Sequence, residues 1–234
     1  MTSRQLKILA LLTMTIDHIG AFVFKDIIIL RVIGRIAFPI FTFLYVESYI
    51  HTSNRKNLMI RTTIAAVLGQ ILLSLSGSNL VGIFFLFSLG WLAFALIDKG
   101  FVWVVPLIML TAEYFKVDYG WYGIATLVLF YLLRGKRKQQ CISFVLLTVL
   151  FLISPFFDPS YWPYITPIMQ RFFSEYWVFF IEGFAVLALI PIYFYNGKMG
   201  KRFESKSART FEKYFYYVYY PVHIAILATL GGGL

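Results

Sequence analysis

The sequence predicts an all-α protein, a bundle of helices that lies in a membrane, and three observations predict this class. Hydrophobic residues make up 60% of the 234-residue chain and charged residues only 14%, whereas a soluble domain has roughly a quarter charged residues. The apolar residues form runs long enough to cross a bilayer. The cations lie mainly in the breaks between runs and divide unequally between two sides. These features predict a polytopic integral membrane protein in which residues 1–234 form one domain.

The apolar runs define about nine helices. A helix needs about 20 residues to cross about 30 Å of hydrocarbon. The runs cover residues 6–24, 27–50, 58–76, 79–97, 101–115, 120–134, 140–157, 174–195 and 212–231. Two of them, 101–115 and 120–134, are short for a full crossing and fit a re-entrant hairpin equally well. Both alternatives return the chain to the same side, so the orientation does not depend on the choice.

The cations indicate the orientation. When the breaks are assigned alternately to two sides, 16 Lys and Arg residues fall on one side and three on the other. The three are Lys25, Lys116 and Arg171. By the positive-inside rule the cation-rich side is cytoplasmic, so the amino terminus lies inside and the carboxyl terminus outside. The net charge of +10 therefore reflects topology and contacts with anionic lipid, and it does not indicate nucleic-acid binding.

Four charged or ionisable residues lie well away from the cytoplasmic ends of the first two runs. Asp17 and His18 fall in the outer half of the first, and Arg31 and Arg35 lie at a similar depth in the second. Arg31 and Arg35 share one helix face, and the short connection between the runs makes the two helices antiparallel neighbours. An unpaired charge at this depth costs at least about 3 kcal/mol. We therefore expect Asp17 to pair with Arg31 or Arg35, beside Gly34, which permits a close helix approach.

His18 points to a different surface from Asp17, because adjacent residues on a helix are about 100° apart. It is either a satisfied structural group or a group free to meet a ligand. His223, near the middle of the last run, is a second candidate. The further candidates for buried acids are Glu47 and Glu182.

Four segments carry a resemblance to a known family. They are "LKILALLTMTIDHIG", "LRVIGRIAFPIFTFLYVESYIHTSNRKNLMIR", "YNGKMGKR" and "KYFYYVYYPVHIAIL". In this order they resemble the TraX family of small polytopic membrane proteins, which is named for an acetylase of the F-pilin subunit. The family is similar to a wider superfamily of transmembrane acyltransferases. The match covers both ends of the chain, whereas residues 80–195 are merely hydrophobic.

The resemblance implies acetyl transfer from cytoplasmic acetyl-CoA to an acceptor in or beyond the plasma membrane of a bacterium. The acceptor is an amine or hydroxyl on a pilin-like peptide or a cell-surface glycan, and no metal is expected. The family's motifs fall on Asp17 and His18, on Gly34, Arg35, Phe38, Pro39 and Phe41, on Thr52 and Asn54, and on Tyr220, Pro221 and His223.

Acetyl transfer needs a base near the acceptor and cationic help for the developing oxyanion. His18 fits the base, or a carrier that takes the acetyl group transiently. Arg31 or Arg35 would polarise the thioester carbonyl or fix Asp17, and His223 would complete the catalytic group. The phosphates of acetyl-CoA need groups at the cytoplasmic boundary, and the candidates are Lys7, Thr52, Asn54, Arg55, Lys56 and Arg61. Lys7 precedes His18 by 11 residues, which is about 16 Å along a helix.

Two other classes of function remain open. Asp, His and Arg within membrane helices also build proton relays, so the chain could be a transporter or proton-coupled carrier. The absence of a visible internal repeat in the sequence and the odd number of runs count against this class. The other class is a non-catalytic assembly factor whose polar pairs only specify helix packing.

Overall fold

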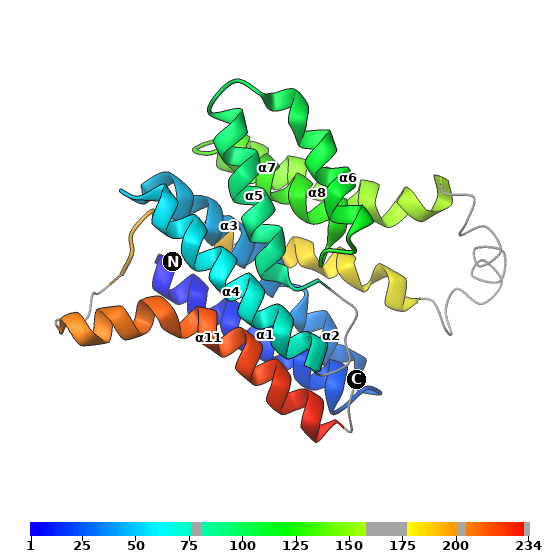
Figure 1. The fold of residues 1–234 in the computed structure, drawn as a ribbon. Coiled ribbons are helices and arrows are strands. Elements are labelled where there is room, and N and C mark those ends of the chain that lie inside the picture. The colour runs from blue at the N-terminus through cyan, green and yellow to red at the C-terminus, as the bar shows by residue number, and fades with distance from the viewer. Residues whose placement is uncertain (76–80, 158–176, 201–204, 232–234) are drawn as a thin grey trace.

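The computed structural model describes residues 1–75, 81–157, 177–200 and 205–231. Within these ranges the elements are helical, and their connections include one isolated parallel bridge between Val81 and Val117. The elements, shown in Figure 1, are α1 (Ser3–Phe22), α2 (Ile28–Gly34), α3 (Ala37–His51), α4 (Arg55–Leu75), α5 (Ile83–Ile97), η1 (Val102–Val104), α6 (Val105–Tyr114), α7 (Gly120–Leu132), α8 (Arg137–Ile153), η2 (Ser154–Phe157), η4 (Trp177–Ala188), α10 (Leu189–Tyr193) and α11 (Lys206–Leu230). The predicted all-α class is confirmed.

The apolar runs of the sequence coincide with these helices. Among the described residues, two helices are long and apolar enough to cross a membrane by length and composition, Ile28–His51 and Arg137–Phe157. The other apolar helices are shorter, while α1, α4 and α11 have 20, 21 and 25 residues and carry more polar side chains. Residues 174–176, at the start of the eighth predicted run, lie outside the described residues.

The second predicted run is one helical stretch, Ile28–His51, with a kink at Arg35 and Ile36. These two residues form a turn between α2 and α3. Pro39 explains the kink, because it lacks a backbone N–H and its ring clashes with the carbonyl four residues earlier, that of Arg35. The α2 segment therefore ends beside Arg35, although Arg35 and Ile36 keep right-handed helical backbone angles.

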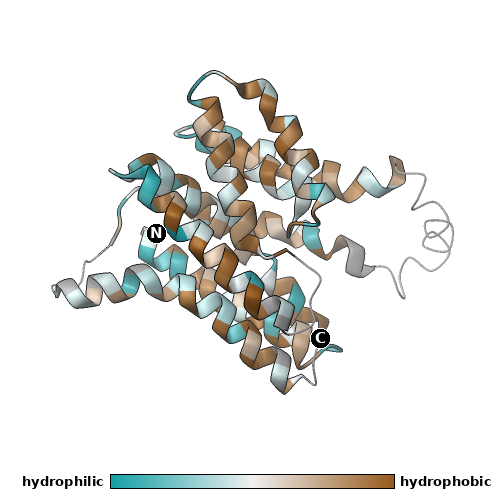
Figure 2. Cartoon of the chain, in the orientation of Figure 1, coloured by the Kyte–Doolittle hydropathy of each residue, from teal (hydrophilic) through white to brown (hydrophobic). Residues whose placement is uncertain are grey.

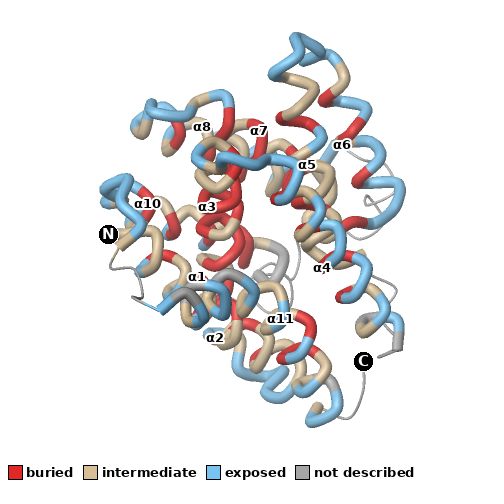
Figure 3. Tube along the Cα trace, turned by 60° about the vertical axis from the view of Figure 1, so that its left-hand side comes forward, coloured by how far each residue is buried: buried red, intermediate tan, exposed pale blue. Residues whose placement is uncertain are grey.

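The core lies where α3 and α7 cross the middle of the molecule. Figure 3 shows buried residues concentrated on these two helices, and α3 packs on α1, α7 and η4. Hydrophobic residues run along most helices (Figure 2), and many of them are exposed. The helix α8 exposes Ile142, Leu146 and Val149, for example. A surface of this kind is unusual for a monomeric soluble protein.

Connections that the cation pattern assigns to one side contact each other in the structure. The amide of Ser3 donates to the carbonyl of Lys198, and the side chain of Arg55 bonds to Asp98 at 2.7 Å. At the other end, the bridge between Val81 and Val117 joins two connections that the pattern assigns outside. The helices α1, α4 and α11 lie side by side between these two ends (Figure 1), and α11 contacts both of the others.

Candidate functional site

A cavity of about 90 Å³ lies between α1, the junction of α2 and α3, α5, α11 and residues 118–119. Its polar lining includes Asp17, His18, Asp118, Tyr119 and Tyr216, and much of the remainder is apolar. The acid and the imidazole that the first predicted helix contains thus face one cavity. A space of this size holds a group of a few non-hydrogen atoms.

Both arginines of the second predicted helix hold Asp17. Nη1 of Arg31 donates to Oδ2 of Asp17 at 2.9 Å, and Nη2 of Arg35 donates to both carboxylate oxygens at 2.6 Å. The predicted pairing of Asp17 with Arg31 or Arg35 is confirmed, and both arginines take part. Because Asp17 is only 7% exposed, its charge is balanced by these two guanidinium groups rather than by water.

Arg35 also binds a second acid. Its Nη1 donates to Oε2 of Glu182 at 3.1 Å, and Glu182 is 6% exposed. One guanidinium therefore joins acids from α1 and η4, which are far apart in the chain. The sequence analysis named Glu182 as a candidate buried acid, but it gave no signal for the partner, because 147 residues separate the two.

Gly34 makes the close approach of α1 and α2 possible. A Cβ atom placed on Gly34 would lie 2.1 Å from Cβ of Asp17, which no side chain tolerates. The expected close approach beside the charges is thereby confirmed. The glycine lets the carboxylate of Asp17 sit between the two arginines, since any larger residue would displace it.

His18 meets His223 across the interface of α1 and α11. Nδ1 of His18 lies 2.6 Å from Nε2 of His223, and the rings are stacked with centroids 4.8 Å apart. Nδ1 of His223 donates to the carbonyl of Tyr219 at 2.8 Å. His18 lines the cavity, whereas His223 is not among the lining residues and contacts the ring of His18 instead. The structure thus brings the two predicted histidines into contact, and of the two it is His18 that lines the cavity.

Asp118 and Tyr119 also face the cavity, although the sequence analysis assigned them only to a connection. Tyr119 has a left-handed backbone (φ 62°) and stacks on Phe38 with centroids 3.7 Å apart. The amide of Asp118 donates to the carbonyl of Val81 at 2.8 Å, which fixes the loop. Burial raises the pKa of Asp118 to about 6. Left-handed backbone at a non-glycine residue is often found at functional sites, but it leaves no clear signal in the sequence.

The candidates for phosphate binding differ in their contacts. Thr52 and Asn54 bond within their own turn, where Asn54 caps α4 by accepting from the amide of Asn57. Arg55 is engaged by Asp98 and stacks over the ring of Tyr49.

The other three candidates for phosphate binding are Lys7, Lys56 and Arg61. Lys56 is exposed. Nζ of Lys7 lies 5.6 Å from the ring centre of Tyr216, a residue that also lines the cavity. Nε of Arg61 is buried and has no hydrogen-bond partner among the described residues. Lys7 and Arg61 are therefore the two cations of this set best placed to take a further anionic partner.

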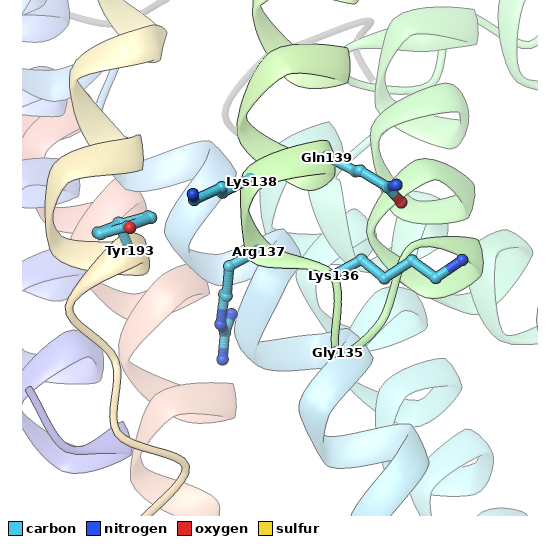
Figure 4. A pocket seen from close by; sticks show the side chains of 6 residues that line it. All are labelled: Gly135, Lys136, Arg137, Lys138, Gln139 and Tyr193. Carbon is cyan, nitrogen blue, oxygen red and sulfur yellow. The ribbon is translucent and has the colours of Figure 1, made fainter.

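A second, open cavity of about 650 Å³ lies at the amino terminus of α8. Figure 4 shows Lys136 and Lys138 pointing to opposite sides of this helix end. Arg137 is occupied by the rings of Phe43 and Tyr195, at 4.5 and 5.1 Å. Because these cations do not converge, this cavity is a poor phosphate site.

These features define an all-helical protein, with helices long and apolar enough to span a membrane, that holds a charged network and a histidine pair in its interior. The chain belongs to the TraX family, whose model, described as "TraX protein", matches residues 2–231. It is 26% identical over 257 residues to a "Probable fimbrial assembly protein FimC, serogroup H1" of Dichelobacter nodosus, covering 96% of this chain and 93% of the relative.

A second relative matches a short segment. It is an uncharacterised protein of Rickettsia prowazekii (strain Madrid E), 55% identical over 38 residues, which is 16% of this chain and 15% of the relative. No solved structure matches the chain. The predicted resemblance to the TraX family is confirmed by the family model.

Proposed function

We propose that this protein is a membrane-embedded acetyltransferase that moves an acetyl group from acetyl-CoA to an amine or hydroxyl acceptor. The supporting observation is the cavity that contains the imidazole of His18 and the charge-paired Asp17, and that is also lined by Tyr216 beneath Lys7. This arrangement offers a base inside the protein and a cation for the donor's phosphates near the cytoplasmic end of α1. It fits the link between the TraX family and pilin acetylation.

In the proposed reaction, the amine nitrogen or hydroxyl oxygen of the acceptor molecule bonds to the carbonyl carbon of the acetyl group. His18 removes the proton from that nitrogen or oxygen at the same time. The carbon–sulfur bond of the thioester then breaks, and the departing thiolate takes the proton back from His18. The products are the acetylated acceptor and free CoA. Arg31, whose side chain is 32% exposed, is the better candidate for the oxyanion, because Arg35 is committed to two carboxylates. A variant of this route has His18 carry the acetyl group itself.

Lys7 and Arg61 would hold the phosphates of acetyl-CoA. On α1, Lys7 and His18 share a face, because 11 residues are close to three helical turns. Leu11 and Met14 lie between them on α1 and line the cavity. A thin pantetheine arm that follows this face would bring the thioester to His18. Lys56 would contribute from the same boundary, while Arg55, Thr52 and Asn54 would shape the turn beside it.

The proposed setting is the bacterial plasma membrane, crossed by about nine helical segments with the amino terminus inside. The contacts between connections assigned to the same side support this arrangement. Lipid would cover the exposed apolar faces, and a peptide or glycan acceptor would reach the cavity from the outer side. Nucleic acid is not a proposed partner.

The test is His18→Ala in purified protein. A lost base or carrier should lower turnover by about a hundredfold or more, while the dissociation constant of CoA stays nearly unchanged, because Lys7 and Arg61 are intact. His51→Ala is the matched control, since His51 is an exposed histidine at the helix end of α3. Retention of more than about a tenth of wild-type transfer would move the assignment to another titratable side chain of the cavity, and Asp118 would be tested next.

The name of the Dichelobacter nodosus relative favours a second candidate, a non-catalytic assembly factor. The two functions differ in what happens to acetyl-CoA. An acetyltransferase releases free CoA and labels an acceptor, whereas an assembly factor leaves the thioester intact. A proton-coupled carrier would move label across the membrane without breaking a bond.

A further inference from the structure

His18 and His223 form a pair whose hydrogen positions follow from their partners. The carbonyl oxygen of Tyr219 can only accept a hydrogen bond, so Nδ1 of His223, 2.8 Å away, carries a hydrogen. A neutral imidazole has one N–H, and Nε2 of His223 is therefore an acceptor. The nitrogen 2.6 Å from it, Nδ1 of His18, must then be a donor.

This chain of donors and acceptors fixes the remaining nitrogen of His18. With its hydrogen on Nδ1, a neutral His18 carries an unshared electron pair on Nε2. His18 lines the cavity, and its Nδ1 is turned toward α11. Nε2 is thus the ring nitrogen left for the cavity, in the form that a base or nucleophile requires.

The surroundings keep the two rings in place. His223 is buried, at 7% exposure, and the ring of Tyr219 stacks on it with centroids 4.8 Å apart. The hydroxyl of Tyr219 lies 2.8 Å from Oγ1 of Thr15, which joins α11 to α1 one turn below His18. Pro221 lies inside α11, between Tyr219 and His223. The pair therefore belongs to a fixed interface between the two helices.

We infer that His223 is a positioning residue that holds His18 in the Nδ1–H tautomer, so that Nε2 of His18 is the reacting atom. This inference rests on the proposed acetyl transfer and deepens it. When Nε2 of His18 takes a proton from the acceptor, the hydrogen bond from Nδ1 to His223 becomes charge-assisted and strengthens. His223 then also stabilises the imidazolium until the thiolate removes the proton. It touches neither substrate nor donor in this arrangement.

Two amide substitutions separate the two hydrogen bonds of His223. His223→Gln places an amide oxygen near the position of Nε2, so it keeps the acceptor for His18. His223→Asn has its amide near the position of Nδ1, so it keeps the donor to Tyr219 and loses the acceptor. Both variants carry a side-chain amide, and they differ in the length of the side chain by one methylene group. Each variant is therefore a control for the other.

The kinetic readout is the separation of kcat from KM. His223→Asn should lower kcat for acetyl transfer by about a hundredfold and leave KM for acetyl-CoA nearly unchanged, because the donor is held elsewhere. His223→Gln should keep most of the wild-type kcat. Equal losses in the two variants, with equal melting temperatures, would overturn the inference.

The structural readout does not need activity. The chain has three histidines, so protein labelled with ¹⁵N-histidine gives a simple spectrum in detergent, with His51→Gln used for assignment. Two-bond couplings between ring nitrogens and carbon-bound ring hydrogens distinguish the tautomers. His18 should be in the Nδ1–H form in the wild type and in His223→Gln, and should leave it in His223→Asn.

The two readouts distinguish the inference from the function on which it rests. A wild-type His18 in the Nε2–H form overturns the inference, whatever the activity. Wild-type protein that never releases CoA overturns the proposed function, and the tautomer spectrum then decides whether the histidine arrangement stands.

Discussion

Arg35 is the residue on which the buried charges depend. Its guanidinium binds Asp17 on α1 and Glu182 on η4, with side-chain exposures near 10% for all three. A buried ion pair gains little over apolar packing, but removing one partner leaves an uncompensated charge, which is strongly destabilising. The network therefore fixes the geometry beside the cavity and makes each member hard to replace.

The first prediction concerns this network. Asp17→Asn should lower the free energy of unfolding by about 3 kcal/mol or more, together with acetyl transfer, because Arg31 and Arg35 both lose the carboxylate charge of Asp17. Thermal unfolding in detergent and protein yield measure the effect. Asp26→Asn is the control, because Asp26 is exposed in the connection after α1. An inactive Asp17→Asn protein with unchanged stability and intact CoA binding would show instead that Asp17 takes part directly in the chemistry.

Sequence reasoning reaches these contacts when the partners are close in the chain. Asp17 and Arg31 are 14 residues apart, and a short connection between two helices is enough to predict their meeting. His18 and His223 are 205 residues apart. Their meeting depends on how α11 packs on α1, which no local pattern specifies. For the same reason, Asp118 could not be distinguished from an ordinary acid in a connection.

Asp98 ties together the ends of several helices. It accepts hydrogen bonds from Tyr49 of α3 at 3.1 Å, from Arg55 of α4 at 2.7 Å and from Tyr131 of α7. Burial alone would raise the pKa of Asp98, but the hydrogen bonds from Tyr131 and Tyr49 and the charge of Arg55 outweigh it and hold this pKa below its usual range. Arg55, a candidate for phosphate binding, thus has a structural contact of its own.

The second prediction follows from the sign of this shift. A carboxylate with a lowered pKa stabilises the folded state above the pKa that it has when unfolded, about 4. This contribution is lost as the pH falls through the folded-state value. Asp98→Asn should therefore lower the melting temperature by a few degrees at pH 7, and the difference from wild type should shrink toward pH 3. A difference independent of pH would show that the charge of Asp98 is unimportant.

A third prediction separates Arg55 from Arg61. Arg55→Ala should lower the melting temperature and leave KM for acetyl-CoA nearly unchanged, because its guanidinium binds Asp98. Arg61→Ala should raise that KM by about tenfold, which corresponds to one lost charge contact of about 1.4 kcal/mol. Lys99→Ala, which removes an exposed cation from the connection after α5, is the control for both. The reverse pattern would make Arg55 the phosphate ligand.

The described helices expose many large apolar side chains, and they enclose a polar site. Composition and run length were enough to predict the all-α class and most helix positions, because both depend on local hydrophobicity. The kink at Arg35 and Ile36 follows from Pro39, which lacks a backbone N–H and crowds the carbonyl of Arg35. The short helices and the connection at 116–119 follow from tertiary packing.

The fourth prediction tests the orientation. With Cys141 replaced by Ser, single cysteines at Ser78, Ser160 and Leu234 should react with impermeant reagents from outside the cell. Cysteines at Ser53, Gln139 and Ser205 should not, because the cation-rich side is expected to be cytoplasmic. Ser78, Ser160 and Leu234, like Arg171 in the cation pattern, lie outside the described residues. Labelling at Ser205 from outside would reverse the orientation.

The position of α11 has a consequence for how the protein is made. Asp17 and its arginines leave the ribosome early, within 18 residues of each other, so this network can form while synthesis continues. His223 follows His18 by 205 residues, and with Tyr216 and Tyr220 it supplies the partner of His18 and one wall of the cavity. A nascent chain would therefore balance the charge of Asp17 before α11 is made, and His18 would gain its hydrogen-bond partner only when α11 packs against α1.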